Sequence, residues 1–432
     1  MKNNTQVLVV ILSGNKVFII TTRNFLPELG GMQILMSDIA RHLSQFNSVK
    51  VFAEYHKHSI EFDNNQKYEI ERVKGFKFIR KFRKANQIEQ LYHKNKNITA
   101  IISDHWKSIE KLSKNLCNEV PTLCLIHGKE INHQIKSPLN IRMINSLKKS
   151  KYIISNSNFT KKLAISKGLP EQKIITINPG IDLNDDDLDE SAAINIFDTN
   201  GPKIITVCRL EKRKGLEQTI LALKNFQSKY KNFKFVIVGD GVEKLNLENQ
   251  VRELNLNKNV IFLNDVSLKL KNSLIKTADF FIMPSIQVGK SIEGFGISFI
   301  EAASYGVGSI GGKVGGASDA VVHNKTGLII PVKSELKIYE SIEFLINNKN
   351  IRKMYGKNSR CKALKNYNEK NWNHLITANR LIFWICCSHF TIRNDDMVFR
   401  ATITNNIVKQ ALHLNRNLTF IHKKLDKILV LA

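Results

Sequence analysis

The chain has few prolines and no long apolar run. Its 432 residues include only 8 Pro and 22 Gly, a composition that excludes collagen-like and low-complexity proteins. Near the start, VLVVIL and VFII are too short for the apolar core of a secretory signal. No run elsewhere approaches the about 18 apolar residues that a membrane-spanning helix needs. We therefore expect a water-facing globular protein of two or three domains.

Cysteine is also scarce, and its spacing matches no metal site. The six cysteines form no CxxC pair, and several lie in apolar runs such as ITVCRL. We interpret them as reduced core thiols, which favours a cytoplasmic protein without disulfides. Any membrane association should then be peripheral.

Acidic residues are outnumbered, 38 Asp and Glu against 65 Lys and Arg, which gives a net charge of +27. A compositional bias toward Lys or an anionic partner would each account for this. The segment 72–84, RVKGFKFIRKFRK, is more specific because it holds seven basic residues and no acid, interleaved with Phe76, Phe78 and Phe82. As a helix it is suited to an anionic bilayer surface. A solvated loop or a nucleic-acid contact is the alternative.

Short β-rich runs alternate with helical patterns along most of the chain, as in VFIITT, SDIARHLSQF and VKVFAEY. This alternation predicts an α/β protein with parallel sheets. We expect two doubly wound, Rossmann-like lobes, an N-terminal lobe at 1–182 and a C-terminal lobe at 201–360. An acidic linker at 183–200 would join them. The ligand cleft would lie between the carboxyl ends of the two sets of strands.

Beyond the second lobe the pattern changes. Residues 361–380 predict a helix that returns to the N-terminal lobe, and 381–432 form a divergent tail without glycine. We assign the tail no role.

The segment IEGFGISFIEAASYG carries the strongest chemical signal. Glu293 and Glu301 are eight positions apart, and Gly294, Phe295 and Gly296 precede a helix that carries the second carboxylate. Amides at a helix N-terminus attract phosphate, and a carboxylate two turns later can accept bonds from sugar hydroxyls. Two Glu at this spacing are otherwise typical of a solvated helix face.

With its flanking segments, the chain resembles the retaining glycosyltransferases of the GT-B fold known as glycosyl transferases group 1. The supporting segments occur in family order over about residues 17 to 375. They are ELGGMQILMSDIARHL, LIHGKEI, ISNSNFTKKLAISKG, VCRLEKRKGLEQTILAL, FVIVGDG, the Glu-x7-Glu block and GGASDAVVHNKTGLIIP.

This resemblance implies that the lobe at 1–182 receives the acceptor and that the lobe at 201–360 binds the nucleotide sugar, and it implies a role for each matching residue of the donor site. Gly30 and Gly31 would form the loop near the donor phosphates, and Arg209 with Lys214 would hold the nucleotide diphosphate. Glu301 would bind the ribose hydroxyls. The remaining matches, Gly294, Phe295 and Gly296, would hold sugar hydroxyls or phosphate through their backbone.

The resemblance also implies the chemistry. Glu293 and His127 would lie beside the transferred sugar, and transfer would proceed with retention through an oxocarbenium-like transition state. The two cations would stabilise the leaving group, so no cofactor and no metal is expected. Glu293 as a covalent nucleophile is a minority hypothesis, since that chemistry needs a second carboxyl group about 5 Å away.

Several patterns do not fit, or depart from the family. Asp185-Asp186-Asp187 contains the D-x-D pattern by which other glycosyltransferases bind a metal, but it lies in the linker rather than after a strand. Gly289-Lys290-Ser291 ends like a phosphate-binding loop but lacks that loop's first glycine. Gly308 occupies a position where relatives usually have proline, and we expect it to loosen a loop near the diphosphate. Asp319 stands where Glu is common.

The sequence therefore predicts a cytoplasmic glycosyltransferase that uses a nucleotide-diphosphate sugar. Its acceptor would be a glycan or a lipid-linked sugar in polysaccharide or lipopolysaccharide synthesis at an anionic membrane, with no nucleic acid involved. One alternative is a sugar-nucleotide epimerase of the same fold. Another is a noncatalytic relative that binds membranes or nucleic acid through its charge.

Overall fold

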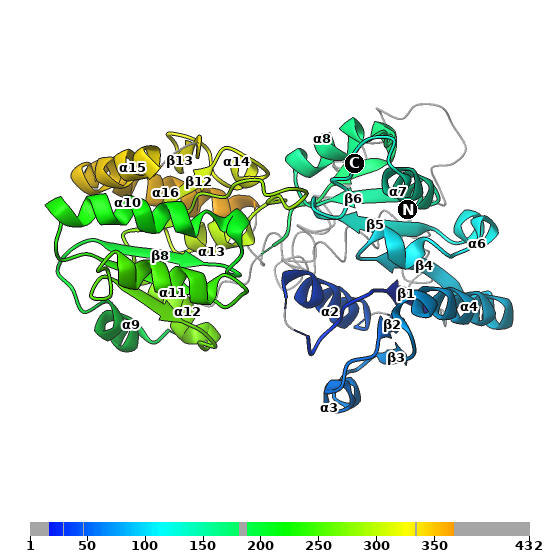
Figure 1. Ribbon diagram of the computed structural model, residues 1–432. Coiled ribbons are helices and arrows are strands. Elements are labelled where there is room, and N and C mark those ends of the chain that lie inside the picture. The colour runs from blue at the N-terminus through cyan, green and yellow to red at the C-terminus, as the bar shows by residue number, and fades with distance from the viewer. Residues whose placement is uncertain (1–16, 29, 46, 181–187, 333–334, 367–432) are drawn as a thin grey trace, which may run out of the picture.

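The chain folds into two α/β lobes that lie side by side (Figure 1). The computed structural model describes residues 17–28, 30–45, 47–180, 188–332 and 335–366. Each lobe has one fully parallel sheet with helices on both faces. The predicted pair of Rossmann-like lobes with a cleft between them is confirmed.

The N-terminal lobe has a seven-stranded sheet in the order β3-β2-β1-β4-β5-β6-β7. Its strands are β1 (Val17–Thr21), β2 (Ser48–Glu54), β3 (Glu69–Val73), β4 (Ile98–Ser103), β5 (Thr122–Ile126), β6 (Tyr152–Ser155) and β7 (Ile174–Thr176). Its helices are α2 (Gly31–Leu43), α3 (Ser59–Asn64), α4 (Lys77–Asn95), α5 (Trp106–Ile109), α6 (Lys114–Glu119), α7 (Pro138–Leu147), α8 (Asn158–Ser166) and the 3-10 turn η1 (Glu171–Lys173).

The C-terminal lobe has a six-stranded sheet in the order β10-β9-β8-β11-β12-β13. Its strands are β8 (Lys203–Val207), β9 (Lys234–Val238), β10 (Val260–Leu263), β11 (Phe280–Met283), β12 (Ser309–Gly312) and β13 (Gly327–Ile330). Its helices are α9 (Glu190–Phe197), α10 (Leu216–Lys229), α11 (Lys244–Glu253), α12 (Leu268–Thr277), α13 (Ile297–Ser304), α14 (Ala317–Ala320), α15 (Glu335–Asn347), α16 (Lys349–Asn366) and the 3-10 turn η2 (Lys212–Lys214).

The strands are buried on both faces, which explains their nearly continuous apolar sequences. In β1, Phe18 and Ile20 pack into one core cluster, whereas Ile19 packs into the cluster on the opposite face. Alternate side chains of a strand point to opposite faces, so each run of this kind joins two helical layers. This packing on both faces fixes the positions of the strands' carboxyl ends, where a ligand site can form.

The predicted linker is partly folded into the C-terminal lobe. Helix α9 falls inside the expected span 183–200, and its Phe197 is fully buried in that lobe's core. Glu190 pairs with Lys276 of α12 at 2.8 Å. The C-terminal lobe therefore begins before residue 201, because apolar residues between the acids give this segment a packing face. The acids Asp185 to Asp187 lie outside the described residues.

Helix α16 ends the described chain. It packs on α13, and its Lys362 Nζ donates to the backbone oxygens of Asp319 and Ala320, both at 2.8 Å. The expected return of 361–380 to the N-terminal lobe lies mostly outside the described residues, as does the tail 381–432. Within the described ranges, no helix combines the length and apolar character needed to cross a membrane.

Candidate active site

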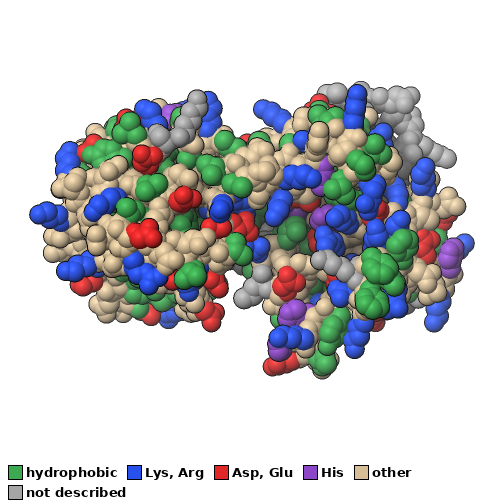
Figure 2. Space-filling model, viewed as in Figure 1, with side chains coloured by type: hydrophobic (Ala, Val, Ile, Leu, Met, Phe, Trp, Pro, Cys, Tyr) green, Lys and Arg blue, Asp and Glu red, His purple; other side chains and the backbone are tan. Residues whose placement is uncertain are grey.

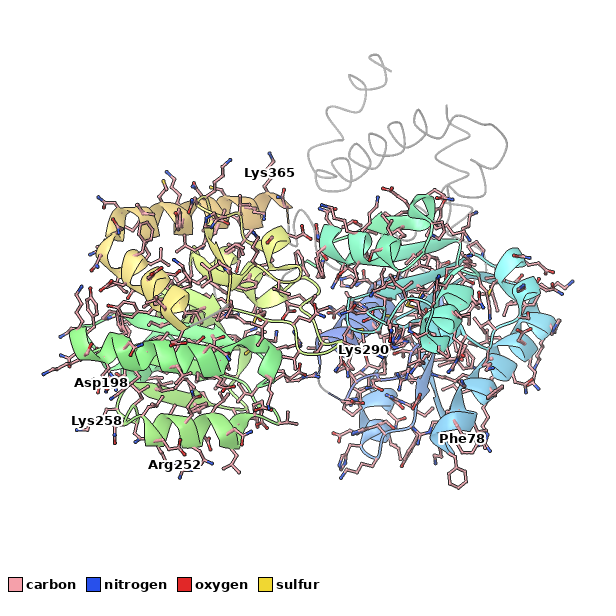
Figure 3. The ribbon with its side chains drawn as sticks, turned by 45° about the horizontal axis from the view of Figure 1, so that its top comes forward. Phe78, Asp198, Arg252, Lys258, Lys290 and Lys365 are labelled. Atoms are coloured by element: carbon pink, nitrogen blue, oxygen red, sulfur yellow. The ribbon has the colours of Figure 1, made fainter. Side chains whose placement is uncertain are left out.

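A cavity of about 690 Å³ lies between the lobes. Gly31 and His127 line it from the N-terminal lobe, and Arg209, Lys214 and Glu293 line it from the C-terminal lobe. These residues follow the carboxyl ends of strands or begin helices, as expected for ligand sites in doubly wound sheets. The volume is in the range of small-molecule sites. Figure 3 shows Lys290 at this junction of the lobes.

A larger depression, about 850 Å³, lies elsewhere on the C-terminal lobe. It is lined by Asp198, Lys258 and Lys234, the first residue of β9, and Figure 3 shows the first two at the far end of the lobe. It contains none of the predicted site residues. Because it lies at the amino ends of the strands, we assign the active site to the smaller interlobe cavity.

Glu293 anchors a buried charge cluster in the interlobe cavity. Its Oε2 accepts hydrogen bonds from Lys214 Nζ at 2.5 Å and from Arg213 Nη1 at 2.7 Å. Arg213 Nε also pairs with Glu211 at 2.7 Å. The sequence analysis named Arg209 and Lys214 for the diphosphate and gave no role to Arg213, which the structure places beside Lys214 on the same carboxylate oxygen.

The electrostatics of the cluster fix the charge of Glu293. Burial alone would raise the pKa of this carboxyl group, but Lys214 and Arg213 lower it below the ordinary value of 4.5. Glu293 is therefore ionised at neutral pH. Two cations, Lys214 and Arg213, thus share the Glu293 carboxylate at the cavity wall, and Glu211 pairs with Arg213 from its other side.

Arg209 and the glycine loop face one another across the lobes. The Arg209 side chain is more than half exposed and approaches Glu211 at 3.7 Å. A Cβ atom added at Gly30 would lie 3.0 Å from Arg209 Nη2 and 2.3 Å from Gln33 Oε1. Glycine thus lets the guanidinium group of one lobe approach the loop of the other. Gly31 begins α2 and has open space around it.

The segment 294–296 connects the lobes as well as lining the cavity. The Gly294 oxygen accepts bonds from the hydroxyls of Ser157 at 2.5 Å and Thr160 at 3.3 Å. A Cβ at Gly294 would lie 1.8 Å from the His127 oxygen, so only glycine permits this contact. Phe295 is buried in the C-terminal core. Gly296 has φ +90° and leads into α13.

Glu301 lies outside the charge cluster at Glu293. It is on α13, and its Oε1 accepts a bond from Lys271 Nζ of α12 at 2.6 Å. It is not among the residues that line the cavity. The structure thus brings the other predicted donor residues together around the cavity and leaves Glu301 beside it, so its role toward ribose stays a prediction.

Histidines form the N-terminal wall. His127 follows β5, and the backbone N–H groups of His127 and Gly128 both donate to Glu130 Oε1. The Nε2 atom of His127 is buried and has no hydrogen-bond partner among the described residues. His105 and His133 line the same wall. The sequence analysis named only His127, because the other two acquire their position from the loops after β4 and β5.

The two departures from the family pattern have structural explanations. Asp319 Oδ2 accepts the backbone N–H of Phe159 at 2.8 Å, across the lobe boundary. Gly308 lies against α16, where an added Cβ would come within 3.1 Å of Tyr355 Cβ. The expectation that Gly308 loosens a loop near the diphosphate is wrong, because it faces α16 rather than the cavity.

One of the two sequence patterns set aside earlier lies in the described residues. Gly289-Lys290-Ser291 forms a tight turn closed by paired bonds between Val288 and Ser291, not a phosphate loop, but it carries Lys290 into the cavity wall. Among the described residues, no group of three or more His, Cys, Asp or Glu could hold a metal ion.

Comparison with known families matches each lobe separately. Residues 187–362 match the family Glycosyl transferases group 1, and residues 29–185 match Glycosyltransferase Family 4. The solved structure of Anabaena HepE in complex with UDP superposes with a TM-score of 0.71 at 17% identity, covering 86% of this chain and 100% of that one. This likeness concerns the fold.

Curated relatives are also named as glycosyltransferases. A GDP-mannose-dependent alpha-(1-6)-phosphatidylinositol monomannoside mannosyltransferase of Mycobacterium tuberculosis is 28% identical over 196 residues, 44% of this chain. That match spans only 51%, about half, of the relative's length. An uncharacterized glycosyltransferase of Methanocaldococcus jannaschii is 23% identical over 83% of this chain and 96% of its own length. The capsular polysaccharide glycosyltransferase CapM of Staphylococcus aureus is 34% identical over 36% of this chain and 39% of its own. The two family matches and the fold together identify the chain as a GT-B glycosyltransferase, with a C-terminal lobe that matches group 1 and an N-terminal lobe that matches family 4.

Proposed function

We propose that the protein transfers a sugar from a nucleotide-diphosphate donor to a hydroxyl group of a glycan or lipid-linked acceptor, with retention at the anomeric carbon. The observation that carries the proposal is the placement of Lys214 and Arg213 in the interlobe cavity, both within hydrogen-bond distance of Glu293. In the donor complex these cations, together with Arg209, would face the diphosphate.

The proposed step breaks the bond between the anomeric carbon and the diphosphate oxygen. The electron pair leaves with the diphosphate, and the developing charge is stabilised by Lys214, Arg213 and Arg209, since fixed cations aimed at a leaving group lower the barrier. The departing oxygen takes the proton of the acceptor hydroxyl on the same face of the sugar. That hydroxyl oxygen then bonds to the anomeric carbon, which retains its configuration.

Glu293 would act in this step by electrostatics. Its Oε2 is already engaged by two cations, which weakens it as a nucleophile and supports a role in orienting Lys214 and stabilising positive charge on the sugar ring. His127, with its buried Nε2, would donate to a hydroxyl group of the transferred sugar. The proposal needs no metal, so we expect chelation by EDTA to leave turnover unchanged.

Retention has a direct test in the products. Proton NMR of the first product formed should display the donor's anomeric configuration, and intact-mass measurement during turnover should reveal no glycosyl adduct. An inverted product would contradict the proposal. An adduct lost in Glu293→Gln would instead support the covalent hypothesis.

The donor base is open to a ligand panel. The mycobacterial relative is named for GDP-mannose, and the HepE structure holds UDP, so both bases are candidates, with ADP as a third. We expect one of UDP, GDP and ADP to raise the melting temperature, because a ligand that binds the native state stabilises it. Arg209→Ala and Glu301→Ala should weaken that shift. No shift with any nucleotide would favour the noncatalytic alternative, and epimer formation without an acceptor would favour the epimerase.

We propose a role in synthesis of a cell-surface polysaccharide, at the cytoplasmic face of the membrane. The capsular and phosphatidylinositol-linked activities named for relatives support this, as do the buried free thiols of Cys117, Cys124 and Cys208.

The segment 72–84 supports a membrane role, but fewer of its residues are available for a membrane than the sequence predicts. It is not one helix, because β3 ends at Val73 and α4 begins at Lys77. Four of its cations are engaged within the protein, since Arg72 pairs with Asp63, Arg80 with Glu54 and Lys81 with Glu110, and Lys84 is buried.

Its three phenylalanines are nevertheless exposed. Phe76, Phe78 and Phe82 have 74%, 69% and 52% of their surface accessible, and Lys111 Nζ lies 4.5 Å from the Phe82 ring centroid. Figure 3 shows Phe78 pointing away from the N-terminal lobe. Figure 2 shows hydrophobic and basic side chains close together over this lobe. Exposed aromatic rings beside lysines suit an anionic bilayer surface.

Vesicle flotation tests this membrane contact. We expect binding to phosphatidylglycerol vesicles and not to phosphatidylcholine vesicles, and we expect a variant with Phe76→Ser, Phe78→Ser and Phe82→Ser to lose it. A matched control changes three exposed apolar residues of the other lobe to serine, Val242, Leu245 and Leu268. Equal binding by both triple variants would contradict the assignment.

A further inference from the structure

The N-terminal wall of the cavity contains a second group of polar side chains, separate from the cluster at Glu293. Lys107 comes from the first turn of α5 after β4, and Lys129 and His133 come from the loop after β5. Lys290 reaches the same cavity from the 288–291 turn of the C-terminal lobe. The two strand ends are neighbours in the sheet, which brings these loops together.

His133 is largely buried beside the backbone of Glu130. Only 9% of its surface is accessible, and neither Nδ1 nor Nε2 makes a hydrogen bond of good geometry among the described residues, although the Glu130 backbone lies close enough to raise its pKa. The rings of Trp106 and His133 pack edge to face, with centroids 6.0 Å apart and an interplanar angle of 88°. A buried ring nitrogen that lacks a good hydrogen bond is unfavourable. Such a group lining a cavity is typical of a ligand site.

The charges around His133 are positive. Its pKa is lowered by burial first and then by Lys290 and Lys107. Burial also lowers the pKa of Lys107, and Arg23 and Arg142 add to that effect. Two acids face this group. The Glu130 carboxylate already accepts the backbone N–H groups of His127 and Gly128, and Glu110, which raises the pKa of Lys107, is already paired with Lys81 and Arg142.

These cations are not needed for the leaving group. Lys214 and Arg213 are held by Glu293 on the opposite wall, whereas Lys107, Lys129 and Lys290 form no ion pair within 4.0 Å in the described part of the chain. A neutral His133 carries one ring N–H, which can donate to an oxygen of a ligand. Lysines and an N–H donor converging on one cavity wall match the oxygens of a phosphate group.

We propose that this wall, formed by Lys107, Lys129, His133 and Lys290, binds a phosphate group carried by the acceptor. The inference rests on the proposed glycosyltransferase function and deepens it, because it names the class of acceptor. The acceptor is either a soluble phosphosugar or a lipid whose headgroup carries the phosphate, and the recognising chemistry is the same for both.

Binding with the donor side occupied tests the site. Calorimetry would titrate glucose 6-phosphate, and glucose as its uncharged match, into protein saturated with the nucleoside diphosphate that stabilises it. We expect glucose 6-phosphate to bind and glucose not to bind. In the variant Lys107→Met with Lys290→Met, the affinity for glucose 6-phosphate should fall at least ~10-fold, with nucleotide affinity within about twofold of wild type.

Two further variants test whether the loss of glucose 6-phosphate binding is specific to this site. Lys258→Met removes an exposed lysine at the far end of the C-terminal lobe (Figure 3) and should change nothing. His133→Phe keeps the ring and its contact with Trp106 but removes both nitrogens, so it should weaken glucose 6-phosphate binding while leaving the melting temperature unchanged or higher.

The lipid arm uses phosphatidic acid displayed in phosphatidylcholine vesicles, with the three phenylalanines mutated to serine to suppress general membrane contact. If the protein binds these vesicles and the variant Lys107→Met with Lys290→Met does not, the ligand is a lipid headgroup. If the protein binds glucose 6-phosphate but not the vesicles, the acceptor is soluble. Nucleotide binding without either probe would overturn the phosphate site and leave the proposed function standing. Equal loss of nucleotide affinity in the double variant would also overturn it, since the lysines would then serve the donor.

Discussion

At the scale of single residues, the decisive contact is the shared carboxylate oxygen of Glu293. Lys214 and Arg213 are adjacent in the turn η2, and both reach the same Oε2 atom. The sequence RLEKRKG contains four cations, and it does not reveal which of them face the cavity. That choice depends on the turn η2, which buries Lys214 and leaves Lys212 exposed.

Removing the charge of Glu293 should therefore destabilise the apo protein. Glu293→Gln leaves Lys214 buried without its counter-ion, and breaking a buried pair from one side costs about 3 kcal/mol. We expect a lower melting temperature without ligand and a larger rise on adding the cognate nucleoside diphosphate, whose charge replaces the carboxylate. Glu253→Gln, at an exposed position of α11, is the control. A Glu293→Gln protein as stable as wild type would refute the buried pair.

His105 predicts an acid-sensitive fold. Its pKa lies well below 6.5, first because of burial and then because of Arg23, Lys107 and the other two histidines. The unfolded state therefore binds a proton at higher pH than the native state, so stability is full above pH 6.5 and decreases as the pH falls. His105 also accepts the N–H of Lys107 at 2.9 Å as a helix cap, which His105→Asn can preserve.

Melting temperatures between pH 8 and pH 5 check this. The wild type should lose more stability over that range than His105→Asn does. Parallel curves for the two proteins would mean that His105 does not titrate as its surroundings require.

At the scale of elements, the join between the lobes is made at the N-terminus of α8. Ser157 bonds the Gly294 oxygen, and Asp319 from α14 accepts the N–H of Phe159. A carboxylate at a helix N-terminus is favourable by charge as well as by hydrogen bonding. The shorter Asp, where relatives commonly have Glu, is suited to this close approach.

Asp319→Ala should loosen this join at a cost of about 1–2 kcal/mol. We expect lower melting temperature, with Asp319→Asn intermediate because its amide oxygen can still accept the bond. Ser191→Ala, at an exposed position of α9, serves as the control for loss of a polar group. Unchanged stability in Asp319→Ala would show that the lobes do not depend on this contact.

The elements also explain how far the sequence could be interpreted. Alternating strands and helices predict both sheets, because buried parallel strands require apolar runs such as VFIIT and KFVIV. Helix α9 was missed because its acids resemble a linker, although Ala193 and Phe197 face the core. Lys107, His133 and Lys290 were missed because their proximity arises only when two loops and a turn from different lobes meet.

At the scale of the whole molecule, the two lobes contribute different groups of side chains to the facing walls of one cavity. In the proposed function, the C-terminal wall would hold the leaving diphosphate through Lys214 and Arg213, and the N-terminal wall would hold the acceptor. The exposed phenylalanines of the segment 72–84, outside the cavity, would contact the membrane. The family resemblance named Arg209, Lys214 and Glu293 of the C-terminal wall but not Arg213, and the roles of these residues stay predictions. The group on the N-terminal wall follows from burial and charge in the folded chain.

The most direct test is turnover of the donor identified by the nucleotide panel. Release of nucleoside diphosphate from that donor would be compared for wild type, Lys214→Met and the exposed neighbour Lys212→Met. The account predicts a fall of ~100-fold or more for Lys214→Met, from the lost stabilisation of the leaving group, and a rate within about twofold of wild type for Lys212→Met. Equal rates for the two variants would contradict it.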